Sequence, residues 1–67
     1  MRGLGVGDRV IFFVYGRTNQ ESTRYGRIVD AFDMNFQLIT ENPERTVWLR
    51  KDCVFPEDYW EGKAPGD

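Results

Sequence analysis

The order of short apolar runs between residues 7 and 55 constrains the fold of this chain most. A β-branched and aromatic run over 10–15 is followed by further strand-like runs over 25–32, 36–40, 46–50 and 54–55. Residues of these types without intervening turn residues favour strands. No segment has a helical period over several turns. The sequence therefore predicts an all-β fold with five short strands.

The length of 67 residues limits the chain to one domain with a thin core. We expect a flexible lead-in over 1–6, a barrel over 7–56 and an acidic tail containing aromatics over 57–67. No run approaches the roughly 18 apolar residues of a membrane span, and no signal peptide is visible. The single cysteine, Cys53, has no partner for an internal disulfide, which favours a cytoplasmic location. With no histidine present, we expect no metal and no cofactor.

The connections between the expected strands have their own signals. The nine residues 16–24 contain no apolar side chain, which predicts a long loop in the first hairpin, a preferred place for function. Gly26 indicates a bulge or a close backbone approach. Pro43 predicts a type I turn over 42–45, and the polar segment 50–52 suits a short 3₁₀ turn. On the second strand, Ile28 and Phe32 are expected to share a face.

Three segments resemble the SH3-like small barrels, in particular the KOW and Tudor-type branches. They are Gly-Asp-Arg-Val at 7–10, Gly-Arg-Ile-Val at 26–29 and Leu-Arg-Lys-Asp-Cys-Val at 49–54. The resemblance implies a single five-stranded SH3-like barrel with a long first hairpin loop and a short 3₁₀ turn before the last strand. The long polar loop departs from KOW elements, which have a glycine-rich turn there.

Two further implications of this resemblance concern function. Tudor-type modules read methylated side chains with an aromatic cage, for which the candidates here are Tyr15, Tyr25, Phe32 and Phe36, beside Asp30 or Asp33. Type II dihydrofolate reductase is another SH3-like barrel, and its active pore contains a Val-Gln-Ile-Tyr segment. The comparable stretch 47–50 reads Val-Trp-Leu-Arg, so that activity is not carried over.

Catalysis is not expected. Acid–base chemistry at neutral pH usually recruits histidine or paired carboxylates, and the carboxylates here lie mostly in turns and the tail. Cys53 has no histidine to activate it and is expected to be a small buried core residue. An enzyme would require an oligomer that builds a shared pore.

Nucleic acid is the second possible partner. Arg17, Arg24 and Arg27 cluster around the long loop, and Tyr25 lies among them. Arginines hold phosphates and aromatic rings stack on bases. Against this interpretation, the isoelectric point is near 5.0, whereas dedicated binders usually have a clearly basic domain.

A protein partner, or self-association, is the preferred hypothesis. Trp48 projects from the fourth strand on the side opposite Val47 and Leu49, so it faces outward if those two lie in the core. Large exposed aromatics dominate binding at protein interfaces. The candidate protein-binding residues are Trp48, Tyr15, Tyr59 and Trp60. Alternatively, the last two fold back over Trp48 and close the end of the barrel.

Overall fold

The computed structural model describes residues 3–60. Five strands and one short 3₁₀ turn make up this part of the chain. They are β1 (Arg9–Phe13), β2 (Thr23–Phe32), β3 (Asn35–Thr40), β4 (Thr46–Arg50), the 3₁₀ turn (Lys51–Cys53) and β5 (Phe55–Pro56). The all-β prediction is confirmed, and the 3₁₀ turn precedes the last strand as expected.

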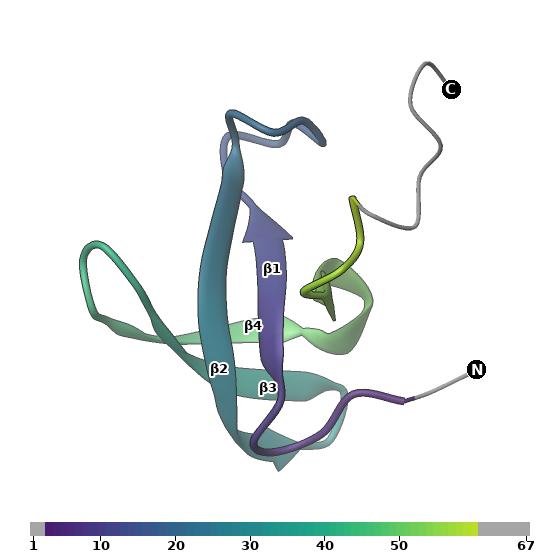
Figure 1. The fold of residues 1–67 in the computed structure, drawn as a ribbon. Coiled ribbons are helices and arrows are strands. Elements are labelled where there is room, and N and C mark those ends of the chain that lie inside the picture. Colours follow the sequence, from purple (N-terminus) through teal and green to yellow (C-terminus); the bar gives the residue numbers. More distant parts are fainter. Residues whose placement is uncertain (1–2, 61–67) are drawn as a thin grey trace.

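The strands form one antiparallel sheet in the order β4-β3-β2-β1-β5. Figure 1 shows β1 and β2 side by side, with β3 and β4 crossing behind them, so that the sheet is strongly bent. The long β2 lies at this bend because it pairs with β1 and with β3. The two outer strands, β4 and β5, do not pair with each other, so the sheet is not closed. Within residues 3–60, no helix is long and apolar enough to cross a membrane.

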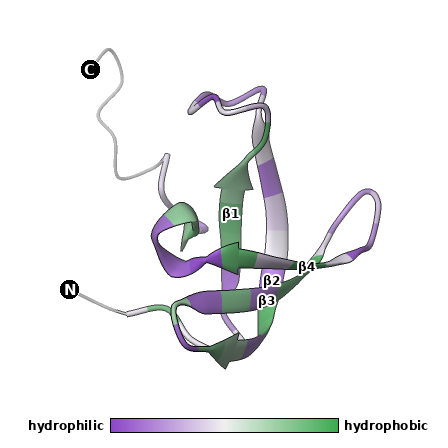
Figure 2. Cartoon of the chain, turned by 180° about the vertical axis from the view of Figure 1, so that it is seen from behind, coloured by the Kyte–Doolittle hydropathy of each residue, from purple (hydrophilic) through white to green (hydrophobic). Residues whose placement is uncertain are grey.

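The main core lies on the concave side of the bent sheet. Its buried members are Val10, Ile28, Phe36, Leu38 and Val54. They come from β1, β2 and β3 and from the residue before β5, and Leu4, Phe12, Val47 and Leu49 pack around them. In Figure 2 the apolar residues concentrate on β1 and on parts of β3 and β4, while the loops are mostly polar. We call the side that faces this core the inner face of each strand.

Strand β1 is buried on both faces, as its sequence indicates. Val10 on the inner face and Ile11 on the outer face are both fully buried. A second aromatic cluster covers the outer face, where Phe13 contacts Phe55 at 5.4 Å between ring centroids and Trp60 at 5.8 Å. The residues that follow β5 therefore help to cover the outer face of β1.

An irregularity in β2 changes which side chains share a face. The register with β3 shifts between Ile28 and Asp30, so Val29 is the extra residue of a bulge. The expectation that Ile28 and Phe32 share a face is wrong, since Ile28 is buried and Phe32 is exposed. Gly26 lies next to the backbone of β3, where a Cβ atom would meet the carbonyl oxygen of Ile39 at 3.0 Å. The close approach predicted at this glycine is therefore confirmed.

The end of β1 and the turn over 42–45 differ from what the sequence predicts. Strand β1 ends at Phe13, and Tyr15 adopts a positive φ of 61° instead of continuing the strand. The predicted type I turn over 42–45 is wrong, because the amide of Arg45 donates to Oγ1 of Thr40 at 3.1 Å. Oγ1 of Thr40 also donates to the carbonyl oxygen of Pro43, and the Asn42–Pro43 peptide bond is cis. Thr40 thus organises the β3–β4 hairpin.

The ends of the chain lie partly outside the described residues. Within the expected lead-in, Leu4 packs against the core, and the amide of Gly5 donates to Oδ2 of Asp8 at 2.8 Å. Of the expected tail over 57–67, the structure describes residues 57–60.

Candidate protein-binding groove

A groove lies between the β1–β2 loop and the β3–β4 hairpin, with a volume of about 370 Å³. Its apolar lining comes from Phe12, Val14 and Val47, which are half-buried. They belong to the inner faces of β1 and β4 and to the residue that follows β1. The rest of the lining is Tyr15, Arg24, Thr40, Glu41, Asn42, Pro43 and Arg45. The bend of the sheet therefore leaves part of its inner face open between two loops.

Both walls of this groove contain a residue with an unusual backbone conformation. Tyr15 has a φ of 61° and Asn42 has a φ of 50°. Asparagine adopts this region readily, whereas for a bulky residue such as Tyr15 it is uncommon and must be supported by the surrounding structure. Tyr15 is 81% exposed, so its ring is offered to solvent at the rim instead of filling the core.

The groove carries an excess of positive charge. Arg24 donates from Nη1 to the carbonyl oxygens of Glu21 and Thr23, which leaves its charge uncompensated. The guanidinium of Arg45 has no hydrogen bond or ion pair with any residue in 3–60. Glu41, the only acidic residue lining the groove, is already engaged by Arg9, with Nη2 to Oε1 at 3.0 Å.

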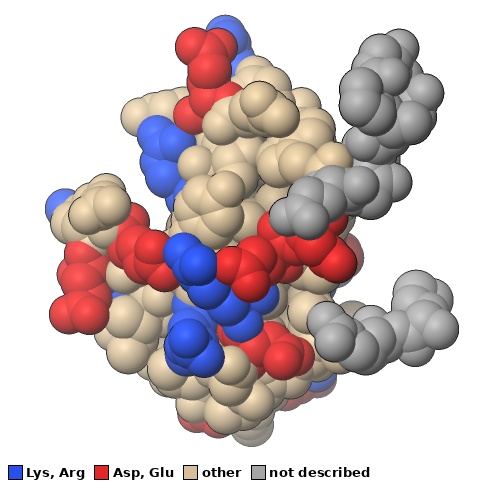
Figure 3. All heavy atoms as spheres, in the orientation of Figure 1, with Lys and Arg blue, Asp and Glu red and all other residues tan. Residues whose placement is uncertain are grey.

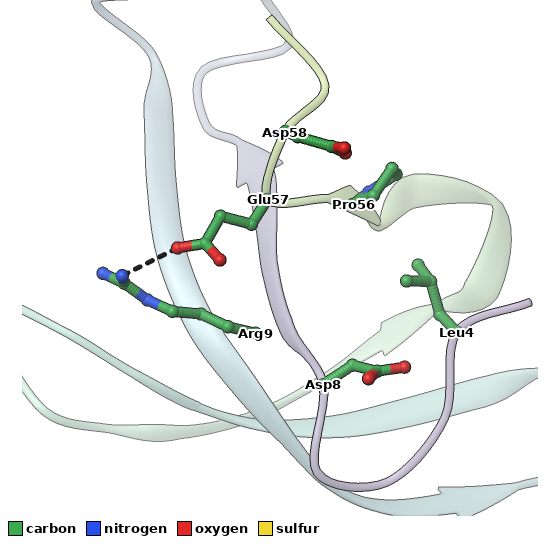
Figure 4. A pocket seen from close by; sticks show the side chains of 6 residues that line it. All are labelled: Leu4, Asp8, Arg9, Pro56, Glu57 and Asp58. Atoms are coloured by element: carbon green, nitrogen blue, oxygen red, sulfur yellow. Dashed lines mark hydrogen bonds and ion pairs between the residues drawn. The ribbon is translucent and has the colours of Figure 1, made fainter. Parts of the chain in front are cut away.

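Arg9 holds a second carboxylate as well as Glu41. Its Nη1 lies 2.8 Å from Oε2 of Glu57, and its guanidinium carbon lies 5.2 Å from the centroid of the Tyr25 ring. The hydrogen bond to Glu41 and the attraction of that carboxylate raise the pKa of Arg9. Figure 4 shows Arg9 and Glu57 at the edge of a small hollow that Asp8 and Asp58 also line.

Residues 3–60 contain no cluster of three or more potential metal ligands.

The structure separates the residues that we expected to bind protein. Trp48 is half exposed on the outer face of β4, opposite Gln37 of β3. Tyr15 lines the groove beside Val47, whose side chain points to the other face of β4. Trp48 and Tyr15 therefore lie on different sides of the same strand, and the β4 backbone lies between them.

Tyr59 and Trp60 lie elsewhere again. Both are half-buried in the aromatic cluster on the outer face of β1, and Nε1 of Trp60 donates to Oγ1 of Thr23 at 3.1 Å. The alternative in which they close over Trp48 is wrong, because their ring contacts are with Phe13 and Phe55.

The four candidate nucleic-acid residues are also divided between faces. Arg24 lies on the inner face at the groove, whereas Tyr25 and Arg27 belong to the outer face of β2 and Arg17 lies in the loop. Nη1 of Arg27 donates to the carbonyl oxygen of Gly7 at 2.8 Å. Figure 3 shows basic and acidic side chains interleaved on the face in view, so no continuous basic surface forms there.

The residues of the expected aromatic cage do not converge. Phe36 is buried in the core, while Phe32 is exposed near the end of β2 that is remote from Tyr25. Tyr15 lies in the groove, and none of the ring contacts within residues 3–60 joins two of these four aromatics.

Cys53 is not the small buried core residue that the sequence predicts. The residue is exposed at the end of the 3₁₀ turn and does not lie in the core. Desolvation raises the pKa of its thiol, as does the hydrogen bond to Asp52. A raised pKa reduces the thiolate population, which is the opposite of what a nucleophilic cysteine requires.

Sequence reasoning missed Arg45, Pro43 and the apolar floor as parts of one site. The signal for the floor was present, because Phe12 and Val14 share a face with Val10, but strand alternation alone assigns all three to the core. By sequence Arg45 is a turn residue, and only the hairpin geometry brings it to the same groove as Arg24.

Comparison of the chain with protein-family models, with curated proteins and with solved structures finds no match.

Proposed function

We propose that this chain is a non-catalytic binding module that contacts another protein through the groove between the β1–β2 loop and the β3–β4 hairpin. The observation that carries the proposal is the exposed Tyr15, held at a positive φ on the rim of an apolar groove. Exposed aromatic and arginine side chains beside an apolar floor are typical of binding hot spots. No cofactor is part of this proposal.

The fold behind this function is, in our proposal, an SH3-like barrel. The strand order β4-β3-β2-β1-β5 and the 3₁₀ turn between the last two strands support this assignment. The connection over residues 14–22 is long and polar, which favours a general SH3-like module over a KOW element. The spread of the aromatics disfavours a Tudor-type cage.

The chemistry of the groove favours a protein segment that carries negative charge. Arg24 and Arg45 line the groove, whereas the carboxylate of Glu41 is neutralised by Arg9. A charge-assisted hydrogen bond between a guanidinium and a carboxylate is about twice as strong as a neutral one. A partner segment with apolar residues and an acidic residue would match both parts of the lining.

Capture of the partner from a native lysate tests the proposal, with three forms of the protein as bait. Tyr15→Ala removes the rim aromatic, and Tyr25→Ala is the matched control on the outer face of β2. We expect a stoichiometric protein to be retained by the wild type and by Tyr25→Ala, with or without nuclease, and to be lost from Tyr15→Ala. Equal retention by all three forms would exclude the groove.

Nucleic acid remains the alternative proposal, with Arg17, Arg24, Arg27 and Tyr25 as its candidate residues. A salt titration with a single-stranded oligonucleotide separates the two, since phosphate contacts give a steep log–log loss of affinity with salt. Capture that disappears after nuclease treatment would favour this alternative. An oligomeric enzyme with a shared pore is the third possibility, and the raised pKa of Cys53 disfavours a thiolate nucleophile in it.

A further inference from the structure

The hydrogen-bond pattern between β3 and β4 determines where the backbone of β4 points. The amide of Thr40 donates to the carbonyl oxygen of Arg45 at 2.7 Å, and the amide of Lys51 donates to that of Met34 at 2.8 Å. These two bonds mark hydrogen-bonded pairs at both ends of one antiparallel ladder. Such pairs alternate with non-hydrogen-bonded pairs. Thr46, Trp48 and Arg50 therefore point their N–H and C=O groups away from β3.

These six backbone groups lie along an open edge. The carbonyl oxygen of Arg50 is at the N-cap of the 3₁₀ turn and accepts the first hydrogen bond of that turn. The other five groups have no partner strand within residues 3–60, because β4 is the last strand of the sheet on this side. Figure 2 shows β4 crossing in front of β1 with no strand along its other side. The opposite edge of the sheet is different, because β5 has only two residues and one is Pro56, which cannot donate. Prolines and very short strands protect edges, and β4 has neither device.

The groove begins at this same edge. Val47 of β4 lines it together with Phe12 and Val14. A strand added beside β4 would place the side chain opposite Val47 on the inner face, next to that apolar floor. From this juxtaposition we infer that the groove binds an extended protein segment by strand addition to β4. The inference rests on the proposed function and specifies how the partner is held.

Charge and direction define the segment further. All pairs in the sheet are antiparallel, so we take the added strand to be antiparallel to β4. Its residues opposite Leu49, Val47 and Arg45 then face inward, in that order along the ligand. Arg45 and Arg24 lie at the hairpin end of the groove. The matching segment is apolar-x-apolar-x-acidic, with the acidic residue at its C-terminal end.

A second copy of this chain fits the site less well. Its own β4 ends at Arg50 and is flanked by Arg45 and Lys51, so pairing of two β4 strands would add positive charge beside Arg24 and Arg45. Like charges at close range disfavour association. The occupant that the charges favour is thus an acidic segment from another protein.

The test uses a blocked peptide, Ser-Val-Thr-Val-Thr-Glu-Ser, and amide hydrogen exchange read by NMR on the full chain. Without peptide, the amides of Val47 and Leu49 should exchange slowly, because they bond to β3, and those of Thr46, Trp48 and Arg50 should exchange fast. Addition of peptide should slow exchange at the amides of Thr46, Trp48 and Arg50 by at least about tenfold at saturation. Each of these amides gains a carbonyl acceptor on the peptide. This alternating pattern distinguishes strand addition from any contact made by side chains alone.

Matched peptides and variants test the two parts of the inference. N-methylation of the first threonine, which faces Trp48, removes a backbone donor and should weaken binding by about tenfold or more. Replacing the glutamate of the peptide with lysine should also weaken binding by about tenfold or more. The Arg45→Glu variant should instead bind the lysine peptide more tightly than the glutamate peptide. Arg17→Gln, in the loop outside the groove, is the control and should leave peptide affinity unchanged.

Each contrary result has a distinct meaning. Equal binding of the N-methylated peptide, or protection that spares Trp48, would overturn strand addition while the groove proposal still stands on the Tyr15→Ala capture. Failure of the acidic peptide to bind at millimolar concentration would overturn the specified ligand. Protection of Thr46, Trp48 and Arg50 without peptide, with sedimentation as a dimer, would assign the edge to a second copy instead.

Discussion

Nε1 of Trp60 donates a hydrogen bond to Oγ1 of Thr23 at 3.1 Å, which joins the segment after β5 to the first residue of β2. The same indole contacts Phe13 edge-on and Tyr59 at 5.2 Å between ring centroids. Ile11, on the outer face of β1, is fully buried although it does not belong to the main core. The last described residues thus belong to the folded unit and cover the outer face of its most apolar strand.

Trp60 should therefore contribute to stability. We expect Trp60→Phe to lower the free energy of unfolding by about 1 kcal/mol through the lost hydrogen bond, and Trp60→Ala by about 2–3 kcal/mol because packing is lost as well. Urea unfolding followed by circular dichroism measures both. Trp48→Ala is the control, since Trp48 is half exposed and lies outside both clusters, and a change within about 0.5 kcal/mol is expected. Equal effects of Trp60→Ala and Trp48→Ala would contradict this assignment.

Gly26 should be required for the close packing of β2 on β3. A Cβ atom there would lie 3.0 Å from the carbonyl oxygen of Ile39 and 3.4 Å from Cα of Thr40, both in the backbone. Because backbone atoms cannot rotate aside, we expect Gly26→Ala to lower the free energy of unfolding by about 1–3 kcal/mol. Gly5→Ala is the control, because no atom lies within 4 Å of its added methyl group. Thermal unfolding that is unchanged in Gly26→Ala would refute the close approach.

The sequence predicted the strands well because β-branched and aromatic runs are short and clearly separated by polar segments. It failed where one extra residue changes the alternation, as at Val29, since a bulge leaves no distinct signature in such a run. Phe32 was misplaced for that reason. Tyr59 and Trp60 are assigned to the cluster with Phe13 only by the three-dimensional path of the chain, which composition does not encode.

The candidate site was only half predictable. The polar loop after β1 and the exposed Trp48 were recognised from pattern, and each lies beside the open edge or the groove. The convergence of Arg24 with Arg45 depends on the bend of the sheet and on the hairpin that Thr40 organises. Residues 21 positions apart in the sequence meet there, and periodicity along one strand carries no information about such a meeting.

The thiol of Cys53 should react slowly for an exposed cysteine. Desolvation and the neighbouring Asp52 raise the pKa of this thiol, so at any pH below that pKa the thiolate fraction is smaller than in an unperturbed cysteine. The rate of alkylation by iodoacetamide at pH 7–8 should be lower than that of a free cysteine peptide, and should rise as the pH increases toward the raised pKa. Asp52→Asn removes the charge, so it should lower the pKa and speed alkylation. A slower reaction in Asp52→Asn would disprove the effect of the carboxylate.

Truncation should destabilise the protein more on the inner face of β3 than on its outer face. Leu38 is fully buried in the main core, whereas its neighbour Ile39 is 37% exposed on the outer face. We expect Leu38→Ala to lower the free energy of unfolding by about 2–5 kcal/mol, since it leaves a cavity, and Ile39→Ala by about 1 kcal/mol or less. If Leu38→Ala does not fold, Leu38→Met keeps the volume and should cost less than about 1.5 kcal/mol. Denaturant unfolding measures all three, and an Ile39→Ala variant as destabilised as Leu38→Ala would mean that the outer face of β3 is covered in solution.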